Sequence, residues 1–254
     1  MALLSVQDLS KSFGGVQAVA GVGFSVEAGE AVAIIGPNGA GKTTCFNMLG
    51  GQLKPDRGQI VLDGRNVAGR PPHVMWRFGI GRTFQVAATF RSMSVREHIQ
   101  LTLLSHRRRL GGMWRPINKQ MVPEADAVLV RVGLMDQADR PAAVLAYADL
   151  KRLELAVALA SEPRLLLLDE PTAGMAAGER QALMALAGNL VRQQGMSMLF
   201  TEHDMDVVFG YADRVIVLHR GAIVAEGPPR HIRADPRVQE IYLGTGFKEG
   251  EKVH

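Results

Sequence analysis

The chain has 254 residues, of which 47% are hydrophobic and 21% are charged, and its formal net charge is +4. This length and balance fit one large α/β domain with a sizeable core. The single cysteine, Cys45, excludes an internal disulfide and fits a reducing compartment. No apolar run approaches the ~20 residues of a membrane-spanning helix, and the N-terminus lacks the basic start and long apolar core of an export signal. We therefore expect a cytoplasmic protein. The mild positive charge could serve nucleotide phosphates or an anionic membrane surface, or have no binding role.

The first elements expected are two strands, at residues 3–6 and 16–26, joined through residues 11–15. Apolar residues alternate with others at the end of the second stretch, which indicates an antiparallel strand with one solvated face. Phe13 lies in the glycine-flanked connection. An exposed ring there could stack on a base, although core packing is the default for an aromatic side chain.

Residues 36–44, Gly-Pro-Asn-Gly-Ala-Gly-Lys-Thr-Thr, match the phosphate-loop pattern of Gly, four free positions, Gly, Lys and Ser or Thr. A buried strand is expected before them at 31–35 and a helix after them. Such a loop turns backbone N–H groups toward a phosphate chain, and the helix start adds its positive dipole end. Lys42 should reach the β- and γ-phosphates, and Thr43 should offer its hydroxyl to Mg²⁺. The probability of a chance match is roughly one per cent.

Strand-like stretches follow at 58–64 and 79–85, with a helical segment at 71–78 between them. Gln85 closes the second stretch. A lone glutamine is usually a polar loop residue, so the local pattern by itself assigns it no role.

From residue 94 to about residue 140 the pattern predicts a helical insertion. Ser94 and Glu97 have the spacing of a capping box, and a second helix is expected over 123–132. The basic run at 106–109 reads first as a solvated face, with contact to anionic lipid or an acidic partner as the alternative.

Residues 164–170, Arg-Leu-Leu-Leu-Leu-Asp-Glu, predict a buried strand with two carboxylates at its C-terminal end. Ligands of open α/β sheets bind outside that edge. Two acids at the tip of a buried strand are costly unless a cation or a reaction needs them. Asp169 suits Mg²⁺, and Glu170 suits the polarisation of an attacking water. Exposed turn acids are the alternative.

A long helix is expected over 177–194 and a buried strand over 197–201. His203 follows this strand and is therefore expected at the same sheet edge as the acid pair. The end of the chain predicts a hairpin at 214–226, two short helices over 228–246 and a mobile tail at 247–254.

With these segments placed, the chain resembles the ATP-binding subunits of ABC transporters over residues 3 to about 243. Within them it resembles the branched-chain amino acid uptake systems through Arg82-Thr83-Phe84-Gln85, Leu145-Ala146-Tyr147, Asp169-Glu170-Pro171-Thr172-Ala173-Gly174 and Thr201-Glu202-His203-Asp204-Met205. The resemblance implies that Phe13 stacks on adenine, that Gln85 senses Mg²⁺ and the attacking water, and that His203 contacts the γ-phosphate. It makes Asp169 the Walker B aspartate and Glu170 the catalytic base.

In this family a signature loop, often Leu-Ala-Tyr-Gly-Gln in this branch, touches the ATP bound by the other subunit. Here the loop reads Leu-Ala-Tyr-Ala-Asp at 145–149, so Ala148 replaces a glycine and Asp149 replaces a glutamine. A methyl group could crowd a phosphate, and a carboxylate repels one. Ala176 stands where the family usually has Asp or Asn. These departures concern the half-site that the chain would lend to a partner.

The resemblance implies an α/β P-loop fold of the ABC type, with a mixed core sheet, an antiparallel β-subdomain and a helical subdomain. It places one ATPase domain at 1–246, with the helical subdomain at about 86–160. The expected catalytic residues are Glu170, His203 and Gln85, and the expected metal-binding residues are Thr43, Gln85 and Asp169. The expected nucleotide-binding residues are Phe13, Gly36, Pro37, Asn38, Gly39, Ala40, Gly41, Lys42, Thr43, Thr44, Ala146, Tyr147 and Ala148.

The expected activity is hydrolysis of Mg·ATP, coupled to solute import through two separate integral-membrane permease subunits at the cytoplasmic face of the cell membrane. The expected partners also include a second ATPase subunit, in a heterodimer or a homodimer, and indirectly a solute-binding protein outside that membrane. Two alternatives stay open. One is a subunit that dimerises on ATP with weak hydrolysis. The other is a soluble ABC ATPase acting on nucleic acid, which we rank low because neither a coiled-coil insertion nor a tandem ATPase domain is present.

Overall fold

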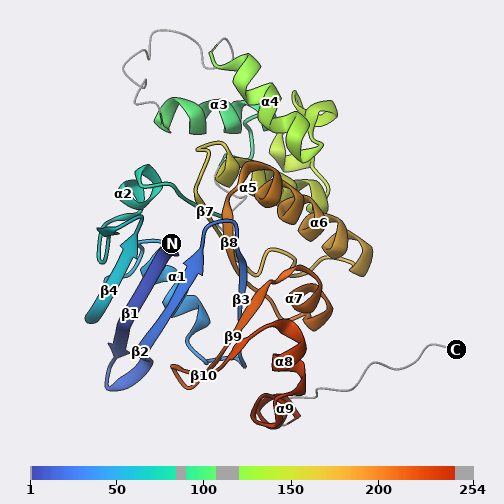
Figure 1. Ribbon diagram of the computed structural model, residues 1–254. Coiled ribbons are helices and arrows are strands. Elements are labelled where there is room, and N and C mark those ends of the chain that lie inside the picture. The colour runs from blue at the N-terminus through green and yellow to red at the C-terminus, as the bar shows by residue number, and fades with distance from the viewer. Residues whose placement is uncertain (1, 84–89, 107–119, 244–254) are drawn as a thin grey trace, which may run out of the picture. The chain divides into compact units, whose positions relative to one another are not determined.

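The computed structural model describes residues 2–83, 90–106 and 120–243, and the chain folds as two compact units. One unit comprises Met1–Pro71 and Leu199–His254, and the other comprises Pro72–Met198. The fold is α/β, with an antiparallel sheet, a mixed sheet and helices (Figure 1). Every helix of the described ranges is too short or too polar to cross a bilayer.

The first unit contains an antiparallel sheet with the strand order β2-β1-β4-β5. Its strands are β1 (Ala2–Phe13), β2 (Val16–Glu27), β4 (Arg57–Leu62) and β5 (Arg65–Asn66). The strand predicted at residues 3–6 is therefore longer in the structure. Most of the connection predicted at residues 11–15 belongs to β1, and only residues 14 and 15 form the turn to β2. Polar residues continue β1 because β2 and β4 pair with its backbone on both sides, which satisfies the N–H and C=O groups whatever side chains they carry.

The first unit also contributes strands to the mixed sheet, in the order β10-β9-β3, and the next strand in that order, β8, contains the chain boundary between the units at residues 198 and 199. Strand β9 pairs in parallel with β3 and antiparallel with β10. The bounds are β3 (Ala31–Ile35), β8 (Ser197–Thr201), β9 (Arg214–His219) and β10 (Ala222–Gly227). All five side chains of β3 are buried, as its apolar, β-branched run predicts. The predicted hairpin at 214–226 is confirmed.

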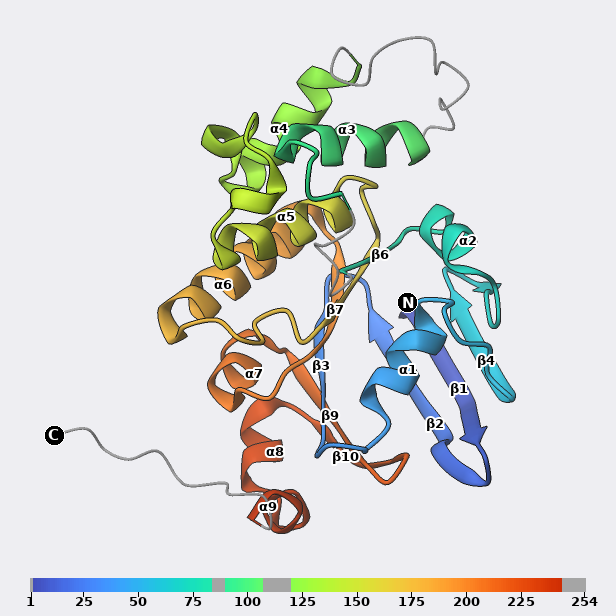
Figure 2. The same ribbon diagram turned by 180° about the vertical axis from the view of Figure 1, so that it is seen from behind.

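Helix α1 (Lys42–Leu49) follows β3 and runs alongside β2 (Figure 2). The other helices of this unit are α7 (Met205–Tyr211), α8 (Pro229–Ala234) and α9 (Pro236–Leu243). The two predicted short helices near the C-terminus are therefore confirmed. The predicted mobile tail lies outside the described residues.

The second unit is mainly helical. Its elements are α2 (Pro72–Arg77), β6 (Ile80–Arg82), α3 (Val95–His106), α4 (Val122–Val132), the 3₁₀ turns Met135–Gln137 and Ala142–Val144, α5 (Tyr147–Leu159), β7 (Leu165–Asp169) and α6 (Ala177–Gln194). Strand β6 pairs in parallel with β7. It begins one residue later than the stretch 79–85 predicted from sequence, because Gly79 has a φ of +91° and turns the chain immediately before it. Residues 84 and 85 of that stretch lie outside the described residues.

Helix α3 begins with the predicted capping box. The Ser94 Oγ accepts a hydrogen bond from the Glu97 N–H at 3.2 Å, and the Glu97 carboxylate accepts one from the Ser94 N–H at 2.8 Å. Helices α3 and α4 pack together, and the Arg96 guanidinium joins them by donating to Asp126 at 2.6 Å (Figure 1). Beyond His106 the predicted basic run lies outside the described residues.

Candidate active site

The loop between β3 and α1 has the backbone of a phosphate-binding loop. Gly41 has a φ of +103° and is the N-cap of α1, and a Cβ atom there would lie 2.3 Å from the carbonyl oxygen of Ala18 in β2. A Cβ atom at Gly36 would lie 2.2 Å from the carbonyl oxygen of Leu218 in β9. Only glycine fits either position. Glycine is therefore required at these two positions because neighbouring strands approach the loop closely, as well as because of the backbone conformation of the turn.

Lys42 places a positive charge inside this loop. Its side chain is buried, and its ammonium donates hydrogen bonds to the carbonyl oxygens of Gly36 at 2.6 Å and Pro37 at 3.2 Å. Thr43, the second residue of α1, is exposed, and Thr44 is half-buried. The N-terminal N–H groups of α1 add partial positive charge at the same place. The loop therefore has the charge and the donors that bind a phosphate chain.

Phe13 ends β1 with 49% of its surface exposed. The Lys11 ammonium lies 5.6 Å from the centre of its ring and also pairs with Asp56 at 2.7 Å. The ring is thus outside the core and available for stacking, which excludes the default of core packing.

His203 lies just beyond β8, which is the neighbour of β3 in the mixed sheet. Its side chain is exposed. The following residue, Asp204, caps α7 by accepting hydrogen bonds from the N–H groups of Asp206 and Val207 at 3.0 and 3.3 Å. This cap fixes the start of α7, directly after His203.

Cys45 lies in α1 and is fully buried. Burial raises the pKa of its thiol to about 12, so the thiol stays protonated at neutral pH. Cys45 is thus a small hydrophobic residue of the core.

In the second unit, the four leucines of β7 are buried, as their run predicts, and Asp169 ends the strand. The Asp169 carboxylate pairs with the Arg82 guanidinium at 3.3 Å, and both side chains are largely buried. Burial lowers the pKa of Arg82, and the charge of Asp169 and its hydrogen bond partly offset this effect. The sequence by itself gives Arg82 no role. Arg82 ends β6 and Asp169 ends β7, and opposite charges at the ends of two strands are the pattern that could have predicted their pairing.

Glu170 has a φ of +48°, in the left-handed region that a non-glycine residue adopts at a cost of about 1–2 kcal/mol. Its carbonyl oxygen accepts a hydrogen bond from the Ala173 N–H at 3.2 Å, which closes a tight turn. Backbone strain of this kind persists where the surrounding structure imposes it and is common at active sites.

The stretch at 145–149 leads directly into α5, whose N-cap is Ala146 and whose first residue is Tyr147. Ala148 and Asp149 lie in the first helical turn and are half-buried. The Asp149 carboxylate lies 3.8 Å from the guanidinium of Arg152 one turn later, a long and partly solvated pair that contributes little energy but reduces the local negative charge.

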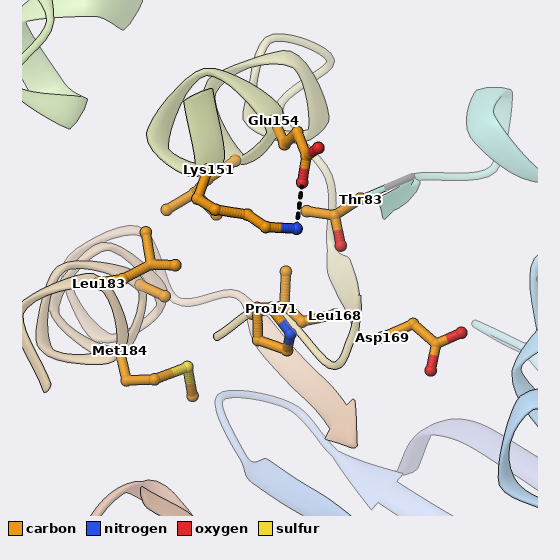
Figure 3. A pocket seen from close by; sticks show the side chains of 10 residues that line it. Thr83, Lys151, Glu154, Leu168, Asp169, Pro171, Leu183 and Met184 are labelled. Atoms are coloured by element: carbon orange, nitrogen blue, oxygen red, sulfur yellow. Dashed lines mark hydrogen bonds and ion pairs between the residues drawn. The ribbon is translucent and has the colours of Figure 1, made fainter. Parts of the chain in front are cut away.

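A small pocket lies between α5, α6 and the end of β7 (Figure 3). Within it, the Lys151 ammonium pairs with the Glu154 carboxylate at 3.1 Å, and Pro171 lies below this pair. The cavity volume is about 10 Å³, close to the space that one water molecule needs. It therefore cannot hold a nucleotide. Its ion pair instead packs near the turn at 170–173 (the acid turn).

The N-terminus of α6 lacks the side-chain cap that α3 has. Ala176 has the extended N-cap conformation, and its N–H donates to the Glu179 carboxylate at 3.3 Å, but its methyl group accepts nothing in return. We expect Ala176→Asp to raise the free energy of unfolding by about 0.5–2 kcal/mol, because the new carboxylate can cap two orphan N–H groups. Urea denaturation would measure the change. Ala177→Asp is the control, since it adds the same charge one residue inside the helix, and equal effects of the two variants would contradict the capping argument.

The structure brings Arg82 to Asp169 and Tyr147 to the loop after β7, and it places the loop at 36–41, Phe13 and His203 in the first unit. Gln85 lies outside the described residues, so its predicted role stays a prediction.

The comparisons with known proteins agree with this arrangement. The ABC transporter family model matches residues 19–173, and a model of the branched-chain amino acid ATP-binding cassette transporters matches residues 222–248. The chain is 39% identical to the high-affinity branched-chain amino acid transport ATP-binding protein BraF of Pseudomonas aeruginosa, over 95% of this chain and 98% of that protein. It is also 39% identical to LivG of Escherichia coli, a protein of the same description, with the same coverage.

Two solved structures have the same fold. A nucleotide-free ATP-binding cassette from an ABC transporter superposes with a TM-score of 0.85 at 31% identity, covering 99% of this chain and 100% of that one. The ADP conformation of the cassette MJ1267 gives a TM-score of 0.84 at 32% identity, covering 96% and 99%. The chain therefore belongs to the ABC transporter family, among its ATP-binding, ATP-hydrolysing subunits.

Proposed function

We propose that this chain hydrolyses Mg·ATP to drive import of branched-chain amino acids or related small solutes. The observation that carries the proposal is similarity along nearly the whole chain to relatives named as branched-chain amino acid transport ATP-binding proteins. An ATPase subunit of this kind need not touch the transported solute, so the cargo is inferred from these relatives and not from a pocket.

The residues present fit both a nucleotide and a divalent cation. Glycine at positions 36 and 41 lets the loop pack against the backbone of β9 and β2, and the Lys42 ammonium donates to carbonyl oxygens of the same loop. The hydroxyl of Thr43 and the carboxylate of Asp169 are hard oxygen donors of the kind that Mg²⁺ prefers. When bound, the cation would neutralise phosphate charge. We propose that Phe13 stacks on the adenine ring and that the phosphate chain lies along the loop, from Gly36 to Thr44.

In this proposal Glu170 accepts the proton of the attacking water, while His203 and Gln85 contact the γ-phosphate and the water. Lys42 neutralises charge that builds up on the leaving phosphate oxygens. The signature positions Ala146, Tyr147 and Ala148 would face the nucleotide of a second ATPase subunit. We also propose one ATPase domain at 1–246, with a helical subdomain at about 86–160 and a tail at 247–254.

The proposed partners are two integral-membrane permease subunits, a second ATPase subunit and, indirectly, a solute-binding protein on the other side of the membrane. The chain would then act at the cytoplasmic face of the cell membrane. Proteoliposomes that hold the complete transporter would test this. We expect ATP inside the vesicles to drive leucine uptake, and Lys42→Ala to abolish it. Uptake that is unchanged by Lys42→Ala, or copurification of the chain with nucleic acid in place of membrane proteins, would contradict the proposal.

A second function has specific support from three residues. Ala148, Asp149 and Ala176 depart from the family pattern in the segments expected to complete a partner's site, so the chain could close on ATP while hydrolysing it weakly. Hydrolysis by the assembled complex discriminates between the two functions, as set out in the Discussion.

A further inference from the structure

Tyr147 connects the start of α5 to the turn that contains Glu170. Its hydroxyl donates a hydrogen bond to the carbonyl oxygen of Ala173 at 2.9 Å. The N–H of the same Ala173 donates to the carbonyl oxygen of Glu170 at 3.2 Å. The peptide groups of Ala173 thus join the phenol on one side to the acid turn on the other. Because Tyr147 and Ala173 belong to different elements, 26 residues apart, this contact is tertiary.

The loop packs closely against the phenol. Gly174 has a φ of +78°, and a Cβ atom added there would lie 3.4 Å from the Tyr147 hydroxyl, in ordinary van der Waals contact. The turn from Thr172 to Met175 is closed by a further backbone hydrogen bond of 3.1 Å. The tyrosine oxygen therefore contacts the loop at Ala173, where two hydrogen-bonded turns overlap.

The ring of Tyr147 has its own support within α5. The Lys151 ammonium, one helical turn later, lies 5.5 Å from the ring centre. That ammonium is itself held by Glu154 at 3.1 Å, and the Lys151 and Glu154 side chains are only 8% and 10% exposed. Pro171, inside the acid turn, lines the same pocket as this ion pair (Figure 3). The buried ion pair of Lys151 and Glu154 therefore lies close both to the Tyr147 ring and to Pro171 in the acid turn.

Glu170 needs such support because its backbone is strained. A left-handed glutamate relaxes toward a more favourable φ unless the residues around it prevent the change. We propose that Tyr147 is a positioning residue: its hydroxyl holds the turn at 170–173 so that the Glu170 carboxylate keeps the orientation needed for proton transfer. This inference rests on the proposed catalytic role of Glu170. It assigns the phenol a function within its own chain, besides any contact with a partner's nucleotide.

Tyr147→Phe tests the proposal because it removes one oxygen atom and keeps the ring. We expect kcat for ATP hydrolysis to fall about tenfold, with KM for ATP within twofold of the native value. Amide hydrogen exchange of the full chain should become faster in the segment 170–176 and stay unchanged elsewhere. Tyr211→Phe, the same atomic change in α7, is the matched control and should alter neither quantity.

A double-mutant cycle adds a readout that a general structural role would not give. In the Glu170→Gln background, measured by single-turnover kinetics, Tyr147→Phe should cause no further loss of rate. Additive losses, a higher KM with unchanged kcat, or unchanged exchange at 170–176 would overturn the proposal. Absence of hydrolysis by the native protein would instead contradict the proposed function, and the exchange experiment would still test the contact between Tyr147 and the turn.

Discussion

Replacing Glu170 with glutamine is expected to lower ATP turnover by about 10²–10⁴-fold, the usual contribution of a general base. Glutamine has nearly the same shape but cannot accept a proton from the attacking water. Affinity for ATP should stay within about threefold, because the phosphate loop and Lys42 are untouched. Steady-state phosphate release from the assembled complex, together with equilibrium binding of a fluorescent ATP analogue, would measure both effects.

The chain offers a matched control for this substitution. Glu162 also has a left-handed backbone, with a φ of +50°, and it is exposed in the segment before β7. Glu162→Gln removes the same charge from the same conformation, so it should leave turnover unchanged. If the native protein and Glu170→Gln hydrolysed ATP at equal rates, the chain would be an ATP-gated dimerisation subunit and not a working ATPase.

Gly41→Ala is expected to destabilise the first unit by about 2–5 kcal/mol and to abolish ATP binding. The added methyl group would lie 2.3 Å from the Ala18 carbonyl oxygen and 3.4 Å from a methyl carbon of Val19, so the loop or β2 must move. Overpacking of this kind costs about 1–3 kcal/mol, and the left-handed φ adds about 1–2 kcal/mol. Urea unfolding and ATP binding would measure the two effects.

Gly39→Ala separates crowding from backbone strain in the same loop. Gly39 has a φ of +79°, but a Cβ atom there would meet nothing within 4 Å. This variant should lose only the backbone contribution, about 1–2 kcal/mol, and should still fold and bind ATP with reduced affinity. Equal destabilisation by the two substitutions would show that the close approach of Ala18 does not explain the requirement for glycine at position 41.

The sequence was sufficient for features that depend on neighbouring residues. The strand and helix on either side of the glycine loop, the buried leucine strand, the helix over 177–194 and the hairpin at 214–226 all follow from local patterns, and the structure confirms each of these elements. The order of the motifs also identified the family. Boundaries were less secure: β1 continues through polar residues because pairing on two sides stabilises its backbone, and β6 begins at Ile80 because a left-handed glycine precedes it.

The tertiary structure decided which side chains meet. The contact between Arg82 and Asp169 joins residues 87 apart, and the contact between Tyr147 and Ala173 depends on where α5 begins relative to the loop after β7. The left-handed backbone of Glu170 and the approach of Ala18 to Gly41 likewise depend on packing between distant segments. Residue patterns report the 3.6-residue and two-residue periods of single elements, whereas these contacts depend on how elements pack in three dimensions. The family of this protein could therefore be predicted from its sequence, while the contacts between Tyr147 and the turn after Glu170 became visible only in the fold.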